Sequence, residues 1–206
     1  YYLFCTGGGI SVWSSKDMKD WKRENPVFAS PAEWAVKAIP AYRGHTWAPD
    51  IYYHNGLYYL YYSVSAFGKN TSCIGVATNK TLHPASPDFK WVDHGKVIQS
   101  VPGRDMWNAI DPNLIFDENN TPWLSFGSFW NGLKLVKLNS DLKTVAEPQE
   151  WFTIASRPRR QFSADSSAGD GAIEAPFVIR KGKYYYLFAS VDYCCRGVNS
   201  TYKMIV

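Results

Sequence analysis

A repeat is the feature that most limits what this chain can fold into. Three prolines, Pro49, Pro112 and Pro176, lie 63 and 64 residues apart. Each is followed by a short apolar stretch, a polar turn and a second stretch rich in aromatic residues. The turns are His54-Asn55-Gly56, Asp117-Glu118-Asn119-Asn120 and Lys181-Gly182-Lys183. Gly, Asn and Asp between two such stretches are typical of β-hairpins. The repeat therefore predicts three successive hairpins.

A further apolar stretch accompanies each hairpin, so the repeating unit is larger than a hairpin. The stretch 10–15 resembles 74–79, and the stretches 133–138 and 202–206 take the same place in their repeats. Helical periodicity is nearly absent, and 31–39 is at most a short turn of helix. The predicted unit is a four-stranded antiparallel sheet, and regular units of this kind are the signature of a β-propeller. The predicted fold class is all-β.

The repeat also predicts that the chain is a piece of a larger domain. Tyr1-Tyr2-Leu3-Phe4 aligns with Tyr58-Tyr59-Leu60-Tyr61, so the proline of that repeat would precede Tyr1. The chain also ends inside its fourth unit. Because propellers have four to eight blades, we expect residues 1–206 to be a partial propeller catalytic domain, truncated at both ends. It would run from the end of blade 1 through part of blade 4, in a protein of at least four blades, with five favoured.

Composition narrows the class of protein. There are 9 Trp, 14 Tyr and 11 Phe among 206 residues, but only 19% of the residues are charged. This excludes a disordered chain, and there is no apolar run of the ~18 residues that a transmembrane helix needs. The net charge is only +4, and apart from 157–160 the basic residues are scattered, whereas nucleic-acid binders concentrate them on one face. We expect no nucleic-acid partner, no membrane partner and a monomer.

The four cysteines do not indicate a metal site. Cys5, Cys73, Cys194 and Cys195 lack the paired spacing of zinc ligands. The neighbours Cys194 and Cys195 could form a vicinal disulfide, but we expect two packed thiols.

Two acidic residues stand where the inner strands of the predicted propeller begin. Asp111 directly precedes Pro112, and Glu174 lies two residues before Pro176. In a propeller the inner strands line a central channel, and ligands bind at its mouth. Two carboxylates facing each other there suit cleavage of a glycosidic bond, in which one acid protonates the leaving oxygen and another carboxylate activates water or attacks. From the pattern alone, however, turn or strand-end residues without a catalytic role are favoured.

Several motifs together resemble the arabinanases of glycoside hydrolase family 43. They are Thr46-Trp47-Ala48-Pro49-Asp50, Asn108-Ala109-Ile110-Asp111-Pro112, Phe126-Gly127-Ser128-Phe129-Trp130-Asn131-Gly132 and Ala172-Ile173-Glu174-Ala175-Pro176-Phe177. The pieces 193–197 and 200–203 fit the same group. Each motif alone is weak, but the match runs in order along nearly the whole chain, which makes the set specific.

The resemblance implies a five-bladed propeller that cleaves α-1,5-linked L-arabinan with inversion, as an endo-acting enzyme. Three carboxylates do this work in the family. Glu174 matches the general acid, and Asp111 matches the carboxylate that raises the pKa of that acid and holds its orientation. The general base belongs to a His-Asp-Pro motif that the repeat offset places about nine positions before Tyr1. The chain as given is therefore expected to lack its base and to be inactive.

Five further residues are candidates for substrate binding: Trp47, Phe67, Asn108, Ser128 and Trp130. Trp47, at an inner-strand start, could stack on an arabinofuranose ring, and Phe67 stands on a loop that lines the cleft in the resembled family. Asn108 and Ser128 could bind sugar hydroxyls or simply cap strand ends. Trp130 could form a cleft wall or pack between blades. His45 is left out of the catalytic set, because a lone histidine is more often structural.

Two other functions stay open beside the endo-arabinanase. One is an exo-acting α-L-arabinofuranosidase or β-xylosidase of the same fold, and the other is a non-catalytic carbohydrate-binding propeller. No cofactor is expected to be required. The resemblance implies a structural calcium whose histidine ligand lies outside this chain. An arabinan polymer cannot enter a cell intact, so an extracellular or periplasmic location is expected.

Overall fold

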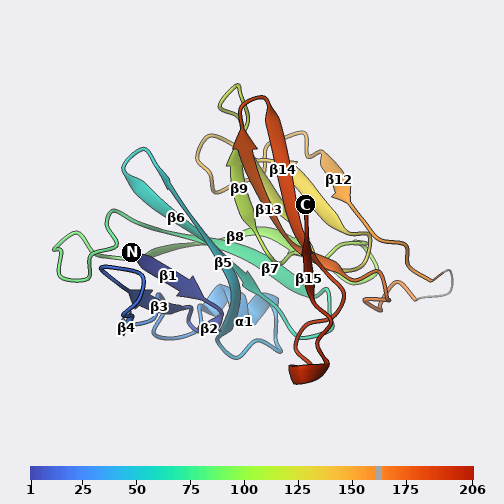
Figure 1. Ribbon diagram of the computed structural model, residues 1–206, viewed down its shortest axis with the longest axis horizontal. Coiled ribbons are helices and arrows are strands. Elements are labelled where there is room, and N and C mark those ends of the chain that lie inside the picture. The colour runs from blue at the N-terminus through green and yellow to red at the C-terminus, as the bar shows by residue number, and fades with distance from the viewer. Residues whose placement is uncertain (161–163) are drawn as a thin grey trace.

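Four β-sheets and very little helix make up the protein. The computed structural model describes residues 1–160 and 164–206. Figure 1 shows the sheets spread from the N-terminal one, in blue, to the C-terminal one, in red. The helices are α1 (Glu33–Ala38) and the 3-10 turn η1 (Gly197–Asn199), and no helix of the described part is long and apolar enough to cross a membrane. The all-β prediction and the short helix expected within 31–39 are both confirmed.

The sheets follow one another along the chain. The first has the order β1 (Tyr2–Cys5), β3 (Ser11–Ser14) and β4 (Lys22–Arg23). The second has the order β2 (Gly7–Gly8), β5 (His45–His54), β6 (Leu57–Val64), β7 (Ser72–Asn79) and β8 (Val92–Ser100). The third has the order β12 (Trp151–Ala155), β11 (Leu133–Lys137), β10 (Pro122–Phe126) and β9 (Asn113–Phe116). The fourth has the order β13 (Ile173–Lys181), β14 (Tyr184–Val191) and β15 (Lys203–Ile205).

The predicted hairpins are all present. The β5–β6 hairpin turns at Asn55 and Gly56, whose φ values of 48° and 81° suit a tight turn that matches the twist of the strands. The β9–β10 and β13–β14 hairpins turn at the other two predicted places. The four-stranded antiparallel unit occurs complete in the third sheet. The second sheet gains a fifth strand because β2 pairs with the beginning of β5.

The residue before each repeated proline has an unusual backbone conformation. Ala48, Asp111 and Ala175 have φ values of 43°, 58° and 53°, in the left-handed region. Side chains avoid this region, and a following proline disfavours helical conformations further. In β5 and β13 the strand register shifts at this point. The left-handed residue therefore recurs in three repeats, and in two of them it lies in a bulge, which sets the direction of the side chains beside it.

Contacts between neighbouring repeats hold these residues in place. The backbone amide of each left-handed residue donates to a side-chain oxygen of the preceding repeat. Ala48 N donates to Thr6 Oγ1 (3.0 Å), Asp111 N to Ser63 Oγ (3.0 Å) and Ala175 N to Asp111 Oδ2 (3.1 Å). An unfavourable backbone conformation persists when the contacts around it hold it in place. Here these contacts are the hydrogen bonds to the preceding repeat.

A second set of hydrogen bonds joins the residues just after the prolines. Asp50 Oδ2 accepts from the backbone amide of Leu114 (3.0 Å) and from Asn113 Nδ2 (3.3 Å). Asn113 Oδ1 in turn accepts from the backbone amide of Val178 (2.8 Å). The second, third and fourth sheets are thus linked by hydrogen bonds near their inner ends. Apolar packing adds to the link between the second and third sheets, since Tyr61 of β6 is fully buried in one cluster with Leu124 and Phe126 of β10.

We expect Asp50→Ala to destabilise the full-length protein by about 2–4 kcal/mol, because two donors of the next sheet lose their acceptor. Urea unfolding measures the loss. Asp88→Ala is the matched control, since Asp88 is exposed and makes only a long surface ion pair with Lys80. It should change the free energy of unfolding by less than about 0.5 kcal/mol. Equal losses in both variants would contradict the linking role of Asp50.

Candidate active site

Glu174 lies at the start of β13, and two hydroxyl groups hold its carboxyl group. Ser128 Oγ donates to Glu174 Oε2 (2.7 Å), and Tyr202 Oη donates to Glu174 Oε1 (2.8 Å). Ser128 also forms a backbone β-bridge with Glu174. The three residues come from the third and fourth sheets, so the carboxyl group sits where these sheets meet. Both of its oxygen atoms have a defined partner.

Asp111 lies beside Glu174. Burial raises the pKa of Asp111 to about 7, and the nearby charge of Glu174 adds to the rise. The amide of Ala175, the residue after Glu174, donates to Asp111 Oδ2 (3.1 Å), and this hydrogen bond lowers the pKa of Asp111. Two carboxyl groups this close in a partly dehydrated place resist being ionised together. The pair can therefore retain a proton near neutral pH, which a general acid requires.

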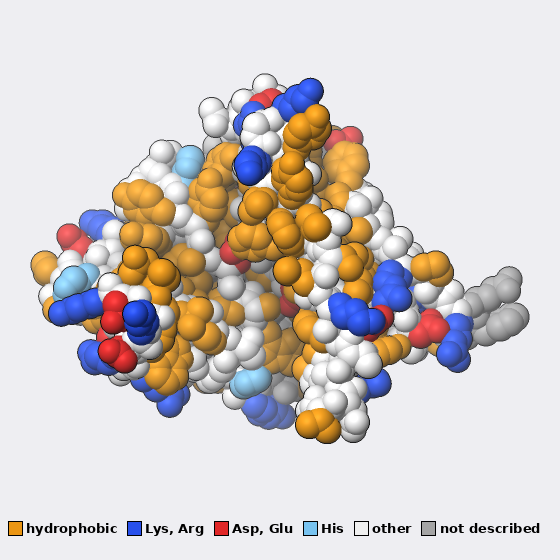
Figure 2. All heavy atoms as spheres, viewed as in Figure 1, with side chains coloured by type: hydrophobic (Ala, Val, Ile, Leu, Met, Phe, Trp, Pro, Cys, Tyr) orange, Lys and Arg blue, Asp and Glu red, His pale blue; other side chains and the backbone are white. Residues whose placement is uncertain are grey.

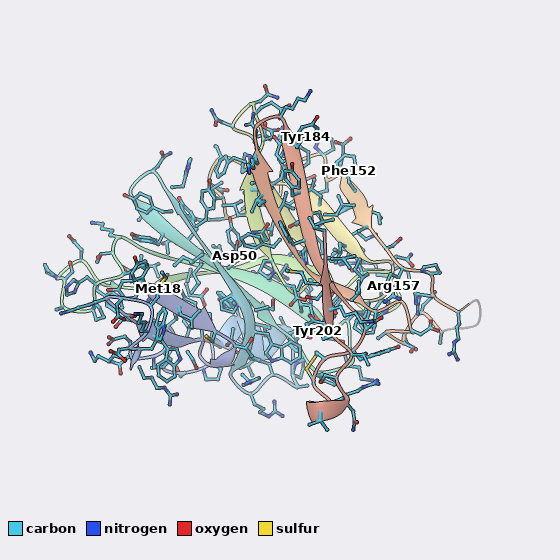
Figure 3. The ribbon with its side chains drawn as sticks, in the orientation of Figure 1. Met18, Asp50, Phe152, Arg157, Tyr184 and Tyr202 are labelled. Carbon is cyan, nitrogen blue, oxygen red and sulfur yellow. A yellow bond between two sulfur atoms is a disulfide. The ribbon has the colours of Figure 1, made fainter. Side chains whose placement is uncertain are left out.

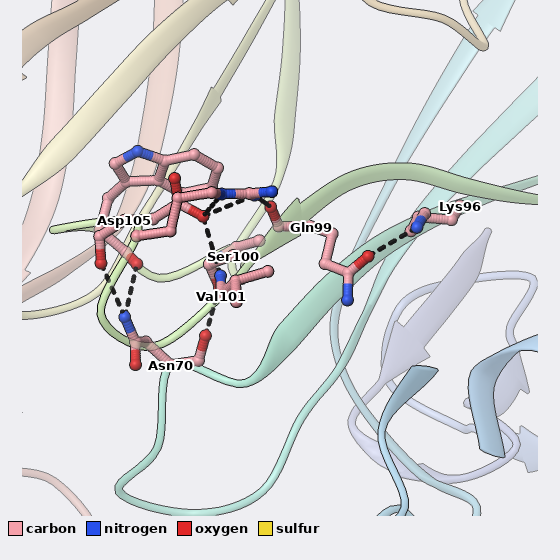
Figure 4. Close-up of polar contacts among 9 residues, drawn as sticks. Asn70, Lys96, Gln99, Ser100, Val101 and Asp105 are labelled. Atoms are coloured by element: carbon pink, nitrogen blue, oxygen red, sulfur yellow. Dashed lines mark hydrogen bonds and ion pairs between the residues drawn. The ribbon is translucent and has the colours of Figure 1, made fainter. Parts of the chain in front are cut away.

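The loop before Asp111 is fixed by buried polar contacts (Figure 4). Asn70 Nδ2 donates to the carbonyl oxygen of Asp105 (2.9 Å), and Ser100 Oγ donates to the carbonyl oxygen of Asn70 (2.7 Å). Ser100 Oγ also accepts from the amide of Ala109 (3.0 Å). Asn70 and Ser100 are buried. The chain is thus restrained up to two residues before Asp111, so the carboxylate has a fixed position.

The segment before Tyr202 is a tight loop that contains a disulfide between adjacent cysteines. Cys194 and Cys195 are joined to each other, so the expectation of two packed thiols is wrong. Cys195 has a φ of 66°, and this turn of the backbone brings the two adjacent side chains together. Cys195 is exposed and Cys194 is partly buried.

Trp47 and Phe67 both reach solvent. Trp47 is partly buried in β5. It is equivalent to Glu174 in the repeat, because each is paired with a serine of the next strand, Ser63 and Ser190 respectively. Its Nε1 donates to His45 Nδ1 (2.9 Å). Phe67 is 80% exposed on the loop after β6. Sugar stacking by these two rings stays a prediction.

The other three candidates are buried. Asn108 is 4% exposed, and its Oδ1 accepts from Ser72 Oγ (2.6 Å). Trp130 is 2% exposed, and its Nε1 donates to the carbonyl oxygen of Asp165 (2.9 Å). The side chains of Asn108 and Trp130 thus have partners within the protein, and their contact with a sugar stays a prediction. Ser128 is at the site, but its hydroxyl binds Glu174.

The sequence reasoning missed Tyr202 as a site residue. Tyr202 precedes β15 and lies at the lower end of that strand in Figure 3, with Arg157 to its right. Burial raises the pKa of Tyr202, and the negative charges of Glu174 and Asp111 contribute. One signal in the sequence could have indicated Tyr202, because it lies in the stretch 200–203 that fits the resembled family. The repeat did not indicate it, because Tyr202 is not equivalent to a candidate site residue of another repeat.

The site lies in a hollow of the face drawn in Figure 2, where acidic side chains are visible among hydrophobic ones. No group of three or more His, Cys, Asp or Glu side chains that could hold a metal ion occurs in residues 1–160 and 164–206. The structure thus offers no side-chain cluster for the calcium ion that the resemblance implies, and the ion stays a prediction. Two neighbouring carboxyl groups in this hollow are an arrangement that the cleavage of a glycosidic bond can use.

Comparison with known proteins identifies the family. The model of glycosyl hydrolases family 43 matches residues 1–206, and the chain belongs to this family. It is 59% identical over 206 residues to an extracellular exo-α-(1→5)-L-arabinofuranosidase of Cellvibrio japonicus, covering all of this chain and 59% of the relative. It is 44% identical over 196 residues to an extracellular endo-α-(1→5)-L-arabinanase of Bacillus subtilis, covering 95% of this chain and 56% of the relative.

A solved structure has the same fold. The α-L-arabinanase of Cellvibrio cellulosa, in complex with arabinohexaose, superposes with a TM-score of 0.96 at 60% identity, covering 98% of this chain and 64% of that one. The chain thus spans somewhat under two thirds of the proteins it matches.

Proposed function

We propose that this chain is part of an enzyme that hydrolyses α-1,5-linked L-arabinan, with Glu174 as its general acid. The observation that carries the proposal is the carboxyl group of Glu174, held at both oxygens and placed beside the buried carboxyl group of Asp111. Paired carboxylates occur in enzymes that cleave many different glycosides. The similarity to relatives named for activity on α-(1→5)-linked L-arabinose supports arabinan as the substrate. A non-catalytic binding protein would have no use for such an acid.

The chemistry follows from what each group can do. Glu174 gives its proton to the oxygen that leaves C1 of the cleaved arabinose, as that bond breaks and positive charge develops on the sugar ring. Asp111 lies beside this acid, and its Oδ2 accepts from the amide of Ala175, the residue after Glu174, which helps to hold the start of β13 in place. An attacking water on the opposite face needs a base, and we expect this base outside the chain, upstream of Tyr1. Attack from that face inverts the anomeric configuration.

The four sheets are proposed to be blades of a five-bladed β-propeller. Their support is the recurrence of the same left-handed residue before the same proline, and of its contact to the preceding repeat. A ring of such units directs the inner strand starts toward a common axis. Glu174 and Asp111 stand at these strand starts and would face the mouth of the channel, with Trp47 and Phe67 available for sugar stacking.

The position of cleavage within the polymer has two candidates. Endo cleavage is expected from the sequence and is the named activity of the Bacillus subtilis relative. Exo cleavage is favoured by the higher identity, 59%, to the relative named as an exo-acting arabinofuranosidase. Both relatives are named extracellular, which supports the proposal that the whole protein is secreted.

The test uses the full-length enzyme and linear α-1,5-arabinan. We expect hydrolysis in which proton NMR shows the β-anomer of the new reducing end appearing first, because an α-linkage is inverted. An endo enzyme lowers viscosity early and releases a ladder of oligomers, whereas an exo enzyme releases one short product while viscosity falls slowly. First appearance of the α-anomer would contradict inversion, and binding without hydrolysis would contradict the enzyme assignment.

A further inference from the structure

Tyr202 supplies half of the hydrogen bonding to the Glu174 carboxyl group. Its hydroxyl donates to Oε1 at 2.8 Å, while Ser128 occupies Oε2. Each oxygen atom of the Glu174 carboxyl group thus has one hydroxyl donor. The carboxyl group of Glu174 therefore has little rotational freedom.

The loop 192–202 is built to fix the position of Tyr202. The backbone of Thr201, the preceding residue, donates to the carbonyl oxygen of Tyr193 (3.0 Å), and the Tyr193 amide donates to Thr201 Oγ1 (3.3 Å). The loop is closed at its base in this way, and the Cys194–Cys195 disulfide restricts the turn within it. The guanidinium of Arg196 lies 4.2 Å from the centroid of the Tyr193 ring and covers it.

An ion-pair network anchors both ends of the same loop. Asp192, at its beginning, accepts from Arg157 Nη1 (2.7 Å) and from Lys203 Nζ (3.1 Å). Lys203 directly follows Tyr202, and Arg157 also donates to the carbonyl oxygen of Ala172 (3.1 Å), two residues before Glu174. The segments that carry Tyr202 and Glu174 are thus both connected to the carboxylate of Asp192, one through Lys203 and the other through Arg157. These contacts hold Tyr202 Oη close to Glu174 Oε1.

The second hydroxyl donor depends on the same loop. Ser128 is followed by Phe129, whose ring lies 6.0 Å from that of Tyr193. The amide of Phe129 donates to the carbonyl oxygen of Ile173 (2.8 Å), directly before Glu174. Packing by the loop therefore supports the turn that carries Ser128.

We propose that Tyr202 is a positioning residue for the general acid: its hydroxyl orients the Glu174 carboxyl group and stabilises the carboxylate that remains when the proton has left. This inference rests on the proposed function of Glu174. Negative charge grows on Glu174 during the reaction, and a donor aimed at it acts more strongly in the transition state than in the ground state. Asp111 and Tyr202 itself are the titratable groups that face Glu174 from the neighbouring elements.

Tyr202→Phe in the full-length enzyme tests the inference by removing one oxygen atom. We expect kcat on linear arabinan to fall by about 10-fold, the value of one hydrogen bond to a charged group, with KM changed by less than about twofold. We also expect the alkaline limb of the kcat/KM profile to move up by about half a pH unit or more, because a carboxylate that loses a donor holds its proton more tightly.

A matched control exists in the same sheet. Tyr185 Oη donates to Glu118 Oε2 (2.6 Å) on the exposed side of the hairpins, so Tyr185→Phe removes an identical type of bond away from the site. It should leave kcat and the pH profile unchanged. The position of the pH limb does not depend on how much enzyme is folded, so it decides the outcome even if Tyr202→Phe lowers the yield of folded protein.

An unshifted alkaline limb in Tyr202→Phe, or a rise in KM that accounts for the whole loss of kcat/KM, would overturn the positioning role. The proposed function is judged separately, by the activity of the unmodified enzyme and of a Glu174 variant. If arabinan is cleaved but Tyr202→Phe behaves like Tyr185→Phe, only the inference about Tyr202 is wrong.

Discussion

Glu174→Gln in the full-length enzyme should lower kcat on linear arabinan by about 10³-fold, within the range that general acid catalysis contributes. The amide keeps the size of the carboxyl group and can still accept from Ser128 or Tyr202, so the fold and the binding of arabino-oligosaccharides should survive. What is lost is the proton for the leaving oxygen. Steady-state kinetics with reducing-sugar detection measures the effect.

The chain offers an exact chemical match as a control for this variant. Glu118 is also a carboxylate that accepts from a tyrosine hydroxyl, that of Tyr185, but it lies on an exposed turn between β9 and β10. Glu118→Gln should retain full activity. An oligosaccharide with an activated aryl leaving group should suffer much less from Glu174→Gln than arabinan does, because its departure needs no proton. Turnover of arabinan at the unmodified rate would remove Glu174 from the mechanism.

Asp111→Asn should lower activity and at the same time raise stability near neutral pH. The substitution keeps an oxygen atom that can accept from Ala175 but removes the second ionisable group of the carboxyl pair. We expect kcat to fall by about 10²-fold while arabino-oligosaccharide binding, measured by calorimetry, persists. If activity and its pH profile are both unchanged, Asp111 has no part in tuning the acid.

The stability effect of Asp111→Asn has a defined pH dependence. The folded pKa of Asp111, about 7, lies above the ordinary aspartate value of 3.8. Between these values the folded protein holds a proton that the unfolded chain has released, so the contribution of Asp111 to stability falls as pH rises through this window and then levels off. Asparagine does not titrate. The variant should therefore gain unfolding free energy relative to the unmodified protein from pH 4 to pH 7, reaching a few kcal/mol, and thermal unfolding at several pH values measures it. A constant difference across this range would contradict the raised pKa.

The sequence predicted the hairpins and the strands because their turn chemistry is local. Asn55-Gly56 and Lys181-Gly182-Lys183 interrupt aromatic strands, and such turns form whatever surrounds them. The positions of Asp111 and Glu174 near one another followed from the repeat, since Asp111 is one residue before its proline and Glu174 two residues before its proline, in adjacent repeats. The left-handed conformation of Asp111 did not follow, because a residue before proline normally avoids it.

Side-chain partners were harder to predict than strand positions. For Ser128 the sequence left sugar binding and strand-end capping open and did not predict its hydrogen bond to Glu174. For Trp130 it left a cleft wall and packing between blades open, and the side chain is buried. In both cases the decisive factor is the direction of a side chain in the turn 127–132, where Phe129 and Trp130 have positive φ values and the alternation of a strand no longer applies. Tyr202 reaches Glu174 through the shape of the loop 192–202, whose first residue, Asp192, forms an ion pair with Arg157, 35 residues away in the sequence.

The left-handed residue before each repeated proline has a consequence for substitutions at these positions. The same backbone conformation occurs at Ala48, Asp111 and Ala175, so two of the three residues carry only a methyl group. Asp111 shows that this conformation accommodates a carboxylate side chain. The backbone conformation alone is therefore compatible with a polar side chain at the two alanine positions.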